Sequence, residues 1–143
     1  MTANRVHWVM IDDDATDVKL FELAAQMGGL SMDFESHATV ERGIHEIRKH
    51  ITPGQPIRVV LLLDLHLPGT NGLEALQALR GDPHTRSLPI VMLTSSNDES
   101  DIRQSYALGA NAYVTKPFGL DASMETVRTL HHFWEEVAAL PQA

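Results

Sequence analysis

The chain has 143 residues, 43% of them hydrophobic, which suffices for one buried core but is too short for two ordinary domains. It has no cysteine, which excludes disulfides, thiolate metal sites and thiol catalysis, and its net charge of −8 argues against a nucleic-acid-binding face. No apolar run approaches the roughly 18 residues of a membrane span, and the N-terminus lacks a secretory signal, so we expect a cytoplasmic protein without membrane or nucleic-acid partners.

Short apolar runs that stop at polar or turn residues predict five β-strands. They are residues 6–11, 32–36, 59–63, 90–93 and 112–115. The run 59–63 consists of five aliphatic residues, which is typical of a parallel strand covered on both faces. The run 32–36 alternates apolar with polar residues, the pattern of a strand with one solvated face. We therefore expect 59–63 in the middle of a sheet and 32–36 at its edge.

Apolar residues at helical spacing predict a helix after each strand. The predicted helices are 16–27, 40–49, one from the turn at 68–72 to about residue 80, 98–108 and 120–140. Asp14 is expected to cap the first of them. Strands that alternate with helices through short connections predict one α/β domain with a doubly wound, flavodoxin-like parallel sheet in strand order 2-1-3-4-5. Sites in such sheets form at the carboxyl ends of the strands.

Polar residues follow four of the predicted strands at these carboxyl ends. They are Asp12, Asp13, Asp64, Thr94 and Lys116. Each alone could merely end a strand or cap a helix, but the coincidence of all five predicts one shared cleft. Three neighbouring carboxylates repel one another unless a cation is present, and hard oxygen ligands favour Mg²⁺, with Mn²⁺ as the alternative. Lys116 could pair with an incoming phosphoryl group, Thr94 could donate a hydrogen bond to it, and one carboxylate could be the nucleophile.

Four segments resemble the signature regions of response-regulator receiver domains, in the same order and spacing. They are MIDDDATD, LLLDLHLPGTNGLEAL, VMLTSSND and AYVTKPF. The resemblance implies that Asp64 accepts a phosphoryl group from a cognate histidine kinase. It also implies that Asp13 and Asp64 bind Mg²⁺ directly, that Asp12 acts through water, and that the backbone carbonyl of His66 is a further ligand. Thr94 and Lys116 would bind the phosphoryl oxygens.

The same resemblance implies how the signal leaves the site. Tyr113 would turn inward when Thr94 moves, and the face made by the fourth helix, fifth strand and fifth helix would change. The Lys116–Pro117 bond would be cis. His66 and Ser96 depart from the family's commonest residues beside the route of the attacking water, which leaves the lifetime of the phosphorylated state open.

The last predicted helix carries more apolar surface than a receiver domain needs. Its stripe comprises Leu120, Met124, Val127, Leu130, Trp134 and Val137. We expect a receiver domain over 5–140 with an extended C-terminal helix and no effector domain, and we favour a homodimer interface over additional core for the end of that helix. The ending FWEEVAALP resembles small single-domain receivers that partner phytochrome-type histidine kinases.

Three alternatives stay open. A degenerate receiver would act only as a protein-binding module, without phosphoryl transfer. A phosphohydrolase of the haloacid-dehalogenase type needs a second Asp where this chain has His66. A flavodoxin-like cofactor binder needs a phosphate-cradling loop where this chain has three consecutive Asp.

We expect a signalling protein and not an enzyme, apart from phosphoryl transfer to itself and slow autodephosphorylation. The eight histidines show no metal-binding spacing, since His45 and His50 lie on different sides of a helix.

Overall fold

The five apolar runs form one parallel sheet in the order β2-β1-β3-β4-β5, as predicted, in the computed structural model, which describes residues 5–143. The strands are β1 (His7–Ile11), β2 (Asp33–His37), β3 (Val59–Leu63), β4 (Ile90–Thr94) and β5 (Ala112–Thr115). β3 lies in the middle and β2 at the edge, because β3 is buried at every residue whereas β2 is partly exposed throughout.

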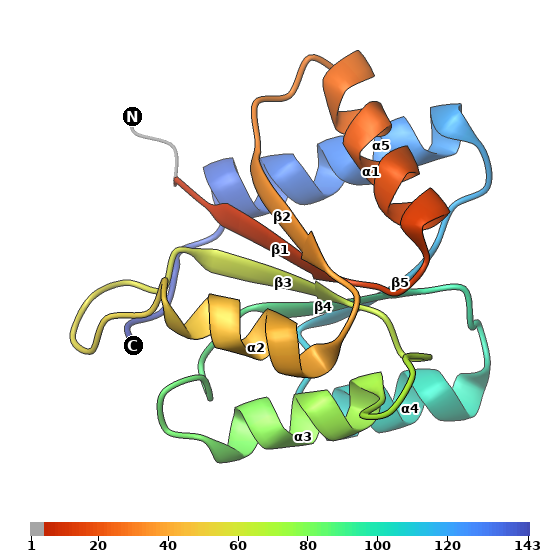
Figure 1. Cartoon of the computed structure of the whole chain (residues 1–143). Helices are drawn as coiled ribbons and strands as arrows, with labels where there is room; N and C mark the ends of the chain where they lie inside the picture. The colour runs from red at the N-terminus through yellow and green to blue at the C-terminus, as the bar shows by residue number, and fades with distance from the viewer. Residues whose placement is uncertain (1–4) are drawn as a thin grey trace.

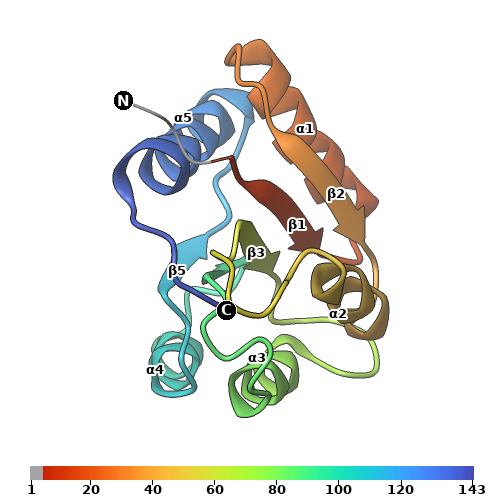
Figure 2. The same cartoon turned by 90° about the vertical axis from the view of Figure 1, so that its left-hand side faces the viewer.

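Helices cover both faces of the sheet (Figures 1 and 2). They are α1 (Ala15–Met27), α2 (Val40–Arg48), α3 (Gly72–Gly81), α4 (Glu99–Ala107) and α5 (Leu120–His132). α1 and α5 lie on one face, and α2, α3 and α4 lie on the other (Figure 2). None of the helices within residues 5–143 combines the length and apolar character that a bilayer crossing needs.

The pleat of the strands divides the core into two clusters, one on each face of the sheet. Val59, Leu61 and Leu63 of β3 pack with α2 and α3, whereas Val60 and Leu62 pack with α1 and α5. Both sets are 0% exposed, which explains why this strand is an unbroken aliphatic run. Burial of each such side chain stabilises the fold by about 1.5–3 kcal/mol.

Asp14 caps α1, as the sequence predicts. Its side chain accepts hydrogen bonds from the N–H groups of Thr16 at 2.9 Å and Asp17 at 3.4 Å. These N–H groups have no acceptor inside the helix, so the cap starts α1 directly after the acidic turn formed by residues 12–14.

The last helix ends earlier than predicted. α5 continues as a π-helical turn, η1 (Phe133–Val137), instead of running as one helix to residue 140. Within η1, Glu135 accepts a hydrogen bond from the Trp8 indole nitrogen at 2.8 Å. The tail then turns back, and the Ile57 N–H donates to the carbonyl of Pro141 at 2.8 Å. Trp134 is buried in the core, whereas Phe133 and Val137 are exposed.

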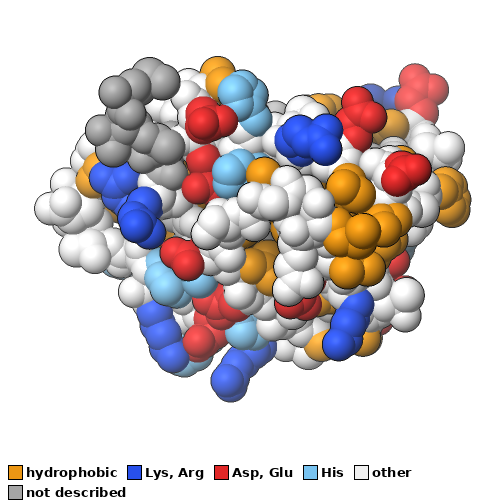
Figure 3. All heavy atoms as spheres, turned by 90° about the horizontal axis from the view of Figure 1, so that it is seen from above, with side chains coloured by type: hydrophobic (Ala, Val, Ile, Leu, Met, Phe, Trp, Pro, Cys, Tyr) orange, Lys and Arg blue, Asp and Glu red, His pale blue; other side chains and the backbone are white. Residues whose placement is uncertain are grey.

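Charged side chains of both signs alternate on the face that looks upward in Figure 1. Figure 3 shows Lys and Arg lying singly or in small groups among Asp and Glu, beside a group of hydrophobic side chains on the right of the view. This distribution is that of a mixed, solvated surface.

Candidate functional site

Three aspartates meet at the carboxyl edge of the sheet. β1 and β3 are neighbours, with Ile11 beside Leu63, so Asp12 and Asp64 follow these strands at the same level. Each of Asp12, Asp13 and Asp64 contributes a carboxylate oxygen, and these oxygens lie within 4.8 Å of one another. Asp12 and Asp64 are buried, while Asp13 is exposed. A cluster of hard oxygens that is open on one side suits a partly hydrated divalent cation.

Lys116 supplies the positive charge of this site. Its ammonium nitrogen lies 3.1 Å from Asp64 Oδ2, 2.8 Å from Asp12 Oδ2 and 2.7 Å from Asp17 Oδ2. Burial would lower the pKa of Lys116, but the carboxylates, led by Asp12 and Asp17, outweigh it and raise the pKa well above its usual value. Lys116 therefore stays charged. Burial also raises the pKa of Asp12, although hydrogen bonds from Lys116 and from the Asp14 N–H partly offset this effect.

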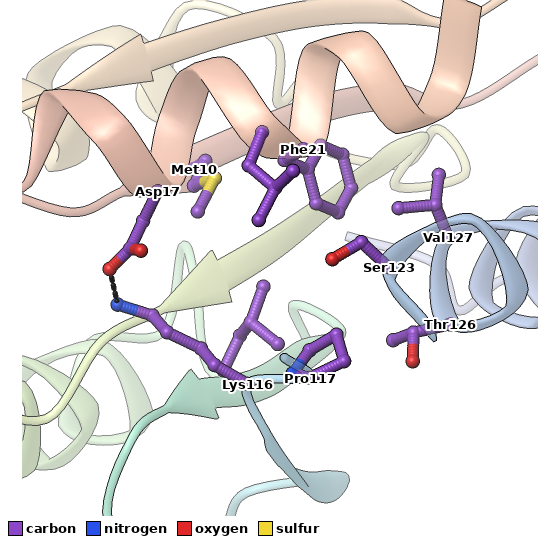
Figure 4. Close-up of a pocket in the computed structure, with 10 residues that line it drawn as sticks. Met10, Asp17, Phe21, Lys116, Pro117, Ser123, Thr126 and Val127 are labelled. Atoms are coloured by element: carbon purple, nitrogen blue, oxygen red, sulfur yellow. Dashed lines mark hydrogen bonds and ion pairs between the residues drawn. The ribbon is translucent and has the colours of Figure 1, made fainter. Parts of the chain in front are cut away.

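Asp17 is a member of the site that the sequence analysis missed. Figure 4 shows its carboxylate, on the first turn of α1, paired with Lys116 at one side of a cavity of about 30 Å³ that both residues line. The signal was present in the segment MIDDDATD, whose last residue is Asp17. It lies three residues after the helix cap Asp14, which places it in the first turn of a helix that starts at the cleft.

The Thr94 hydroxyl is buried and, within residues 5–143, has no hydrogen-bond partner. Thr94 is 0% exposed at the carboxyl end of β4, and its carbonyl accepts a hydrogen bond from the Lys116 N–H at 2.7 Å. A buried hydroxyl left unpaired costs about 1–3 kcal/mol. The strand pair β4 and β5 thus holds an unsatisfied donor next to the residue that carries the ammonium group.

Tyr113 and Ser96 are tied to the chain around α4. The Tyr113 hydroxyl donates to the carbonyl of Ser96 at 2.8 Å, and burial raises the pKa of Tyr113 despite this bond. The Ser96 hydroxyl donates to Asp101 Oδ2 at 2.6 Å. Ser96 therefore braces the start of α4, and its hydroxyl is engaged there. His66 is exposed, two residues beyond Asp64.

The predicted cis bond between Lys116 and Pro117 is wrong. Every peptide bond within residues 5–143 is trans. A trans bond suffices because the hydrogen bond from the Lys116 N–H to Thr94 already holds the backbone at the end of β5, and the long side chain reaches the carboxylates from there.

The loop after Asp64 is fixed by the start of α3. The Gly72 N–H donates to the Leu65 carbonyl at 2.8 Å, and Asn71 and Glu74 form a reciprocal capping box. A Cβ atom at Gly72 would lie 2.7 Å from Leu65 Cα and closer still to the carbonyl oxygen of Asp64. Only glycine allows this approach, so α3 sets the position of the Asp64 backbone.

The fold agrees with comparisons to known proteins. The model of the response regulator receiver domain family matches residues 9–128. The crystal structure of the phosphorylated cyanobacterial phytochrome response regulator RcpA is 26% identical, covers 96% of this chain and 99% of RcpA, and has a TM-score of 0.82. The Mn²⁺-bound form of Rcp1 is 25% identical, covers 95% of this chain and 99% of Rcp1, and has a TM-score of 0.78.

Sequence comparison gives the same result. Rcp1 of Synechocystis is 38% identical over 84 residues, which are 59% of this chain and 57% of Rcp1. FilR2 of Methanothrix harundinacea, a probable methanogenesis regulatory protein, is 26% identical over 88% of this chain and 81% of FilR2. The aligned part spans less than half of other relatives, such as the transcriptional regulator RpaA of Synechocystis at 47%. With the acidic cluster, Lys116 and Thr94 in place, this chain belongs to the response regulator receiver domains of two-component systems and is similar to their phytochrome-associated members.

Proposed function

We propose that Asp64 accepts a phosphoryl group from a histidine kinase of the phytochrome type. The observation that carries this proposal is the ammonium group of Lys116 3.1 Å from Asp64 Oδ2, inside a cluster of three carboxylates. In the reaction, a carboxylate oxygen of Asp64 attacks the phosphorus atom, the bond from phosphorus to the kinase imidazole breaks, and the electron pair returns to the imidazole. The product on this chain is an acyl phosphate.

The residues present fit a divalent cation. Asp13 and Asp64 would bind it directly, and Asp12 would bind it through water. The backbone carbonyl of His66 would be the remaining protein ligand. When bound, Mg²⁺, or Mn²⁺ in its place, would neutralise negative charge on the carboxylates and on the transferred oxygens. The relatives support this assignment, since Rcp1 was crystallised with Mn²⁺ and RcpA in a phosphorylated form.

Lys116 and Thr94 would bind the phosphoryl oxygens. Lys116 exchanges a carboxylate oxygen for a phosphoryl oxygen, and the Thr94 hydroxyl gains the acceptor that it lacks within residues 5–143. Thr94 and Tyr113 are linked through the segment that joins β4 to α4, where Tyr113 bonds to Ser96. Movement of Thr94 would shift the population of Tyr113 positions and change the face made by α4, β5 and α5.

The test is intact-mass spectrometry after incubation with acetyl phosphate and Mg²⁺. We expect one phosphoryl group on the wild-type chain, none without Mg²⁺ and none on Asp64→Asn. Asp14→Asn is the matched control, because it changes a neighbouring aspartate whose capping role asparagine preserves, and it should be phosphorylated like the wild type. If the chain takes up no phosphate and also fails to bind beryllofluoride, the phosphoacceptor role is wrong and the protein acts as a binding module.

We also propose that the chain forms a homodimer through the exposed side of α5 and η1. Phe133 is 46% exposed and Val137 is 60% exposed, although both are large and apolar. Val137→Asp should shift the sedimentation equilibrium toward monomer, because it places a charge in the interface. Met27→Asp is the control, since Met27 is a comparably exposed apolar residue at the end of α1. Equal association of both variants and the wild type would place the interface elsewhere.

A further inference from the structure

Three histidines surround one glutamate on the sheet face that carries α2, outside the acidic pocket that Asp12, Asp13 and Asp64 form. Glu35 Oε1 forms a short contact with His7 Nε2 and lies 3.4 Å from His50 Nε2. The other oxygen, Oε2, lies 2.6 Å from His37 Nε2. The three ligand atoms from His7, Glu35 and His50 all lie within 4.8 Å of one another.

The sheet register brings these residues together. His7 is paired with Asp33 and Val9 with Glu35, so His7, Glu35 and His37 project from the same face of neighbouring strands. Val9 lies in the core cluster that α2 covers, which identifies that face. The chain leaves α2 at Arg48 and brings His50 onto His7, with the two rings stacked at 4.0 Å.

The chemistry of this cluster differs from that of the acidic pocket. Burial would raise the pKa of Glu35, but hydrogen bonds with His7 and His37 outweigh it and lower the pKa, so the carboxylate is charged at neutral pH. Imidazole nitrogens suit Zn²⁺ and its neighbours in the first transition row, whereas Mg²⁺ selects oxygen. In many metal sites, the oxygen of a ligating carboxylate that does not bind the metal forms a hydrogen bond with another side chain, which orients the carboxylate. His37 makes this contact with Oε2 of Glu35.

We propose that His7, Glu35 and His50 form a binding site for a transition-metal dication such as Zn²⁺, with His37 orienting the Glu35 carboxylate. Binding requires the stacked rings of His7 and His50 to open so that both nitrogens point at one ion. The side chain of His50 is 40% exposed and lies beyond the end of α2, so it can make this movement. Water would complete a four-coordinate shell, and the imidazoles would release any bound protons.

A metal at this site would join β1, the edge strand β2 and the segment after α2. β2 contains no buried residue, and the carbonyl of its last residue, His37, accepts a hydrogen bond from the Asp12 N–H at 3.0 Å. The proposed site is therefore linked through one strand end to the acidic turn. It does not depend on phosphorylation of Asp64.

The experiment is a titration of the full chain with Zn²⁺ against a chromophoric zinc indicator, in excess Mg²⁺ to occupy the acidic pocket. We expect one zinc equivalent for the wild type and at least a tenfold loss of affinity in His50→Ala and in Glu35→Gln. His45→Ala is the matched control, because His45 is an exposed histidine of α2 that contacts only Glu46 among the described ion pairs, and its affinity should equal that of the wild type.

Imidazole NMR resonances supply a second measurement. Zinc should move the side-chain signals of His7 and His50 and leave those of His45 unchanged. The proposal is overturned if the wild type binds no zinc, if His50→Ala and Glu35→Gln bind as tightly as His45→Ala, or if zinc binding disappears only in Asp64→Asn. Far-ultraviolet circular dichroism of each variant verifies that a lost site is not lost folding.

Discussion

At the scale of single residues, the site is governed by how one ammonium group is shared. Lys116 contacts Asp12, Asp17 and Asp64, all at 2.7–3.1 Å. The Asp64 contact is the longest of the three, and the Asp17 contact is the shortest. A phosphoryl group on Asp64 would compete with Asp17 for the ammonium group of Lys116. The Asp17 carboxylate should therefore weaken the interaction of Lys116 with the phosphoryl group.

Replacing Asp17 with Asn should therefore strengthen the binding of a phosphoryl mimic. The Asp17 side chain is 31% exposed, so solvent screens the pair and we expect a gain of about 0.2–1 kcal/mol, which is a roughly 1.4-fold to fivefold increase in beryllofluoride affinity. The measurement is calorimetric titration in Mg²⁺, with Glu22→Gln as an exposed acidic control on the same helix. Weaker binding by Asp17→Asn would instead make Asp17 a residue that positions Lys116.

At the scale of elements, the site depends on where strands end and where α3 begins. The register of β1 with β3 brings Asp12 level with Asp64, and the Lys116 N–H bond to Thr94 joins β5 to β4. The start of α3 at Gly72 then presses against the loop after Asp64. Changes in these contacts should therefore shift the Asp64 carboxylate that we propose to be phosphorylated, even though they do not alter a residue of the acidic cluster.

Gly72→Ala should both destabilise the protein and slow phosphorylation. A methyl group there must displace the backbone of Asp64 and Leu65, at a cost of about 1–3 kcal/mol. Gly81→Ala, at the other end of α3, meets no described atom within 4 Å and should be neutral or slightly stabilising. Urea denaturation and the initial rate with acetyl phosphate measure both effects. Equal behaviour of the two variants would refute the role given to Gly72.

At the scale of the whole molecule, the chain after α5 is part of the fold. Trp8 is a fully buried residue of β1, and its indole N–H finds an acceptor only because η1 brings Glu135 over the sheet. Trp134 adds to the same core cluster, and the tail pairs with the segment before β3. The C-terminal segment therefore divides its apolar side chains between the core and the exposed surface to which we assign dimerisation.

Glu135→Ala should lower the free energy of unfolding by about 1–3 kcal/mol, because it leaves the Trp8 indole N–H buried without an acceptor. Glu135→Gln keeps an acceptor and should restore much of the loss. Glu136→Ala is the control, since Glu136 is half exposed and pairs with His132 on the surface, worth about 0.5 kcal/mol or less. Denaturant titration followed by tryptophan fluorescence compares them, and equal losses for Glu135→Ala and Glu136→Ala would contradict this account.

Local sequence patterns predict the sheet, its strand order and the three aspartates of the acidic pocket. Those features follow from local patterns, because the unbroken aliphatic run 59–63 indicates a strand buried on both faces and parallel topology brings all carboxyl ends to one edge. Asp12, Asp13 and Asp64 could therefore be grouped before any contact was known, and their oxygens do converge.

Contacts between side chains of distant elements, in contrast, follow from tertiary packing. The pairing of Lys116 with Asp17, and of Glu35 with three histidines, depends on register and on how α1 and α2 cross the sheet, which local periodicity does not encode. The same holds for the early end of α5, because Glu135 of η1 accepts a hydrogen bond from the indole of Trp8, which is far away in the sequence. Periodicity determines which face a residue occupies, but packing determines its neighbours.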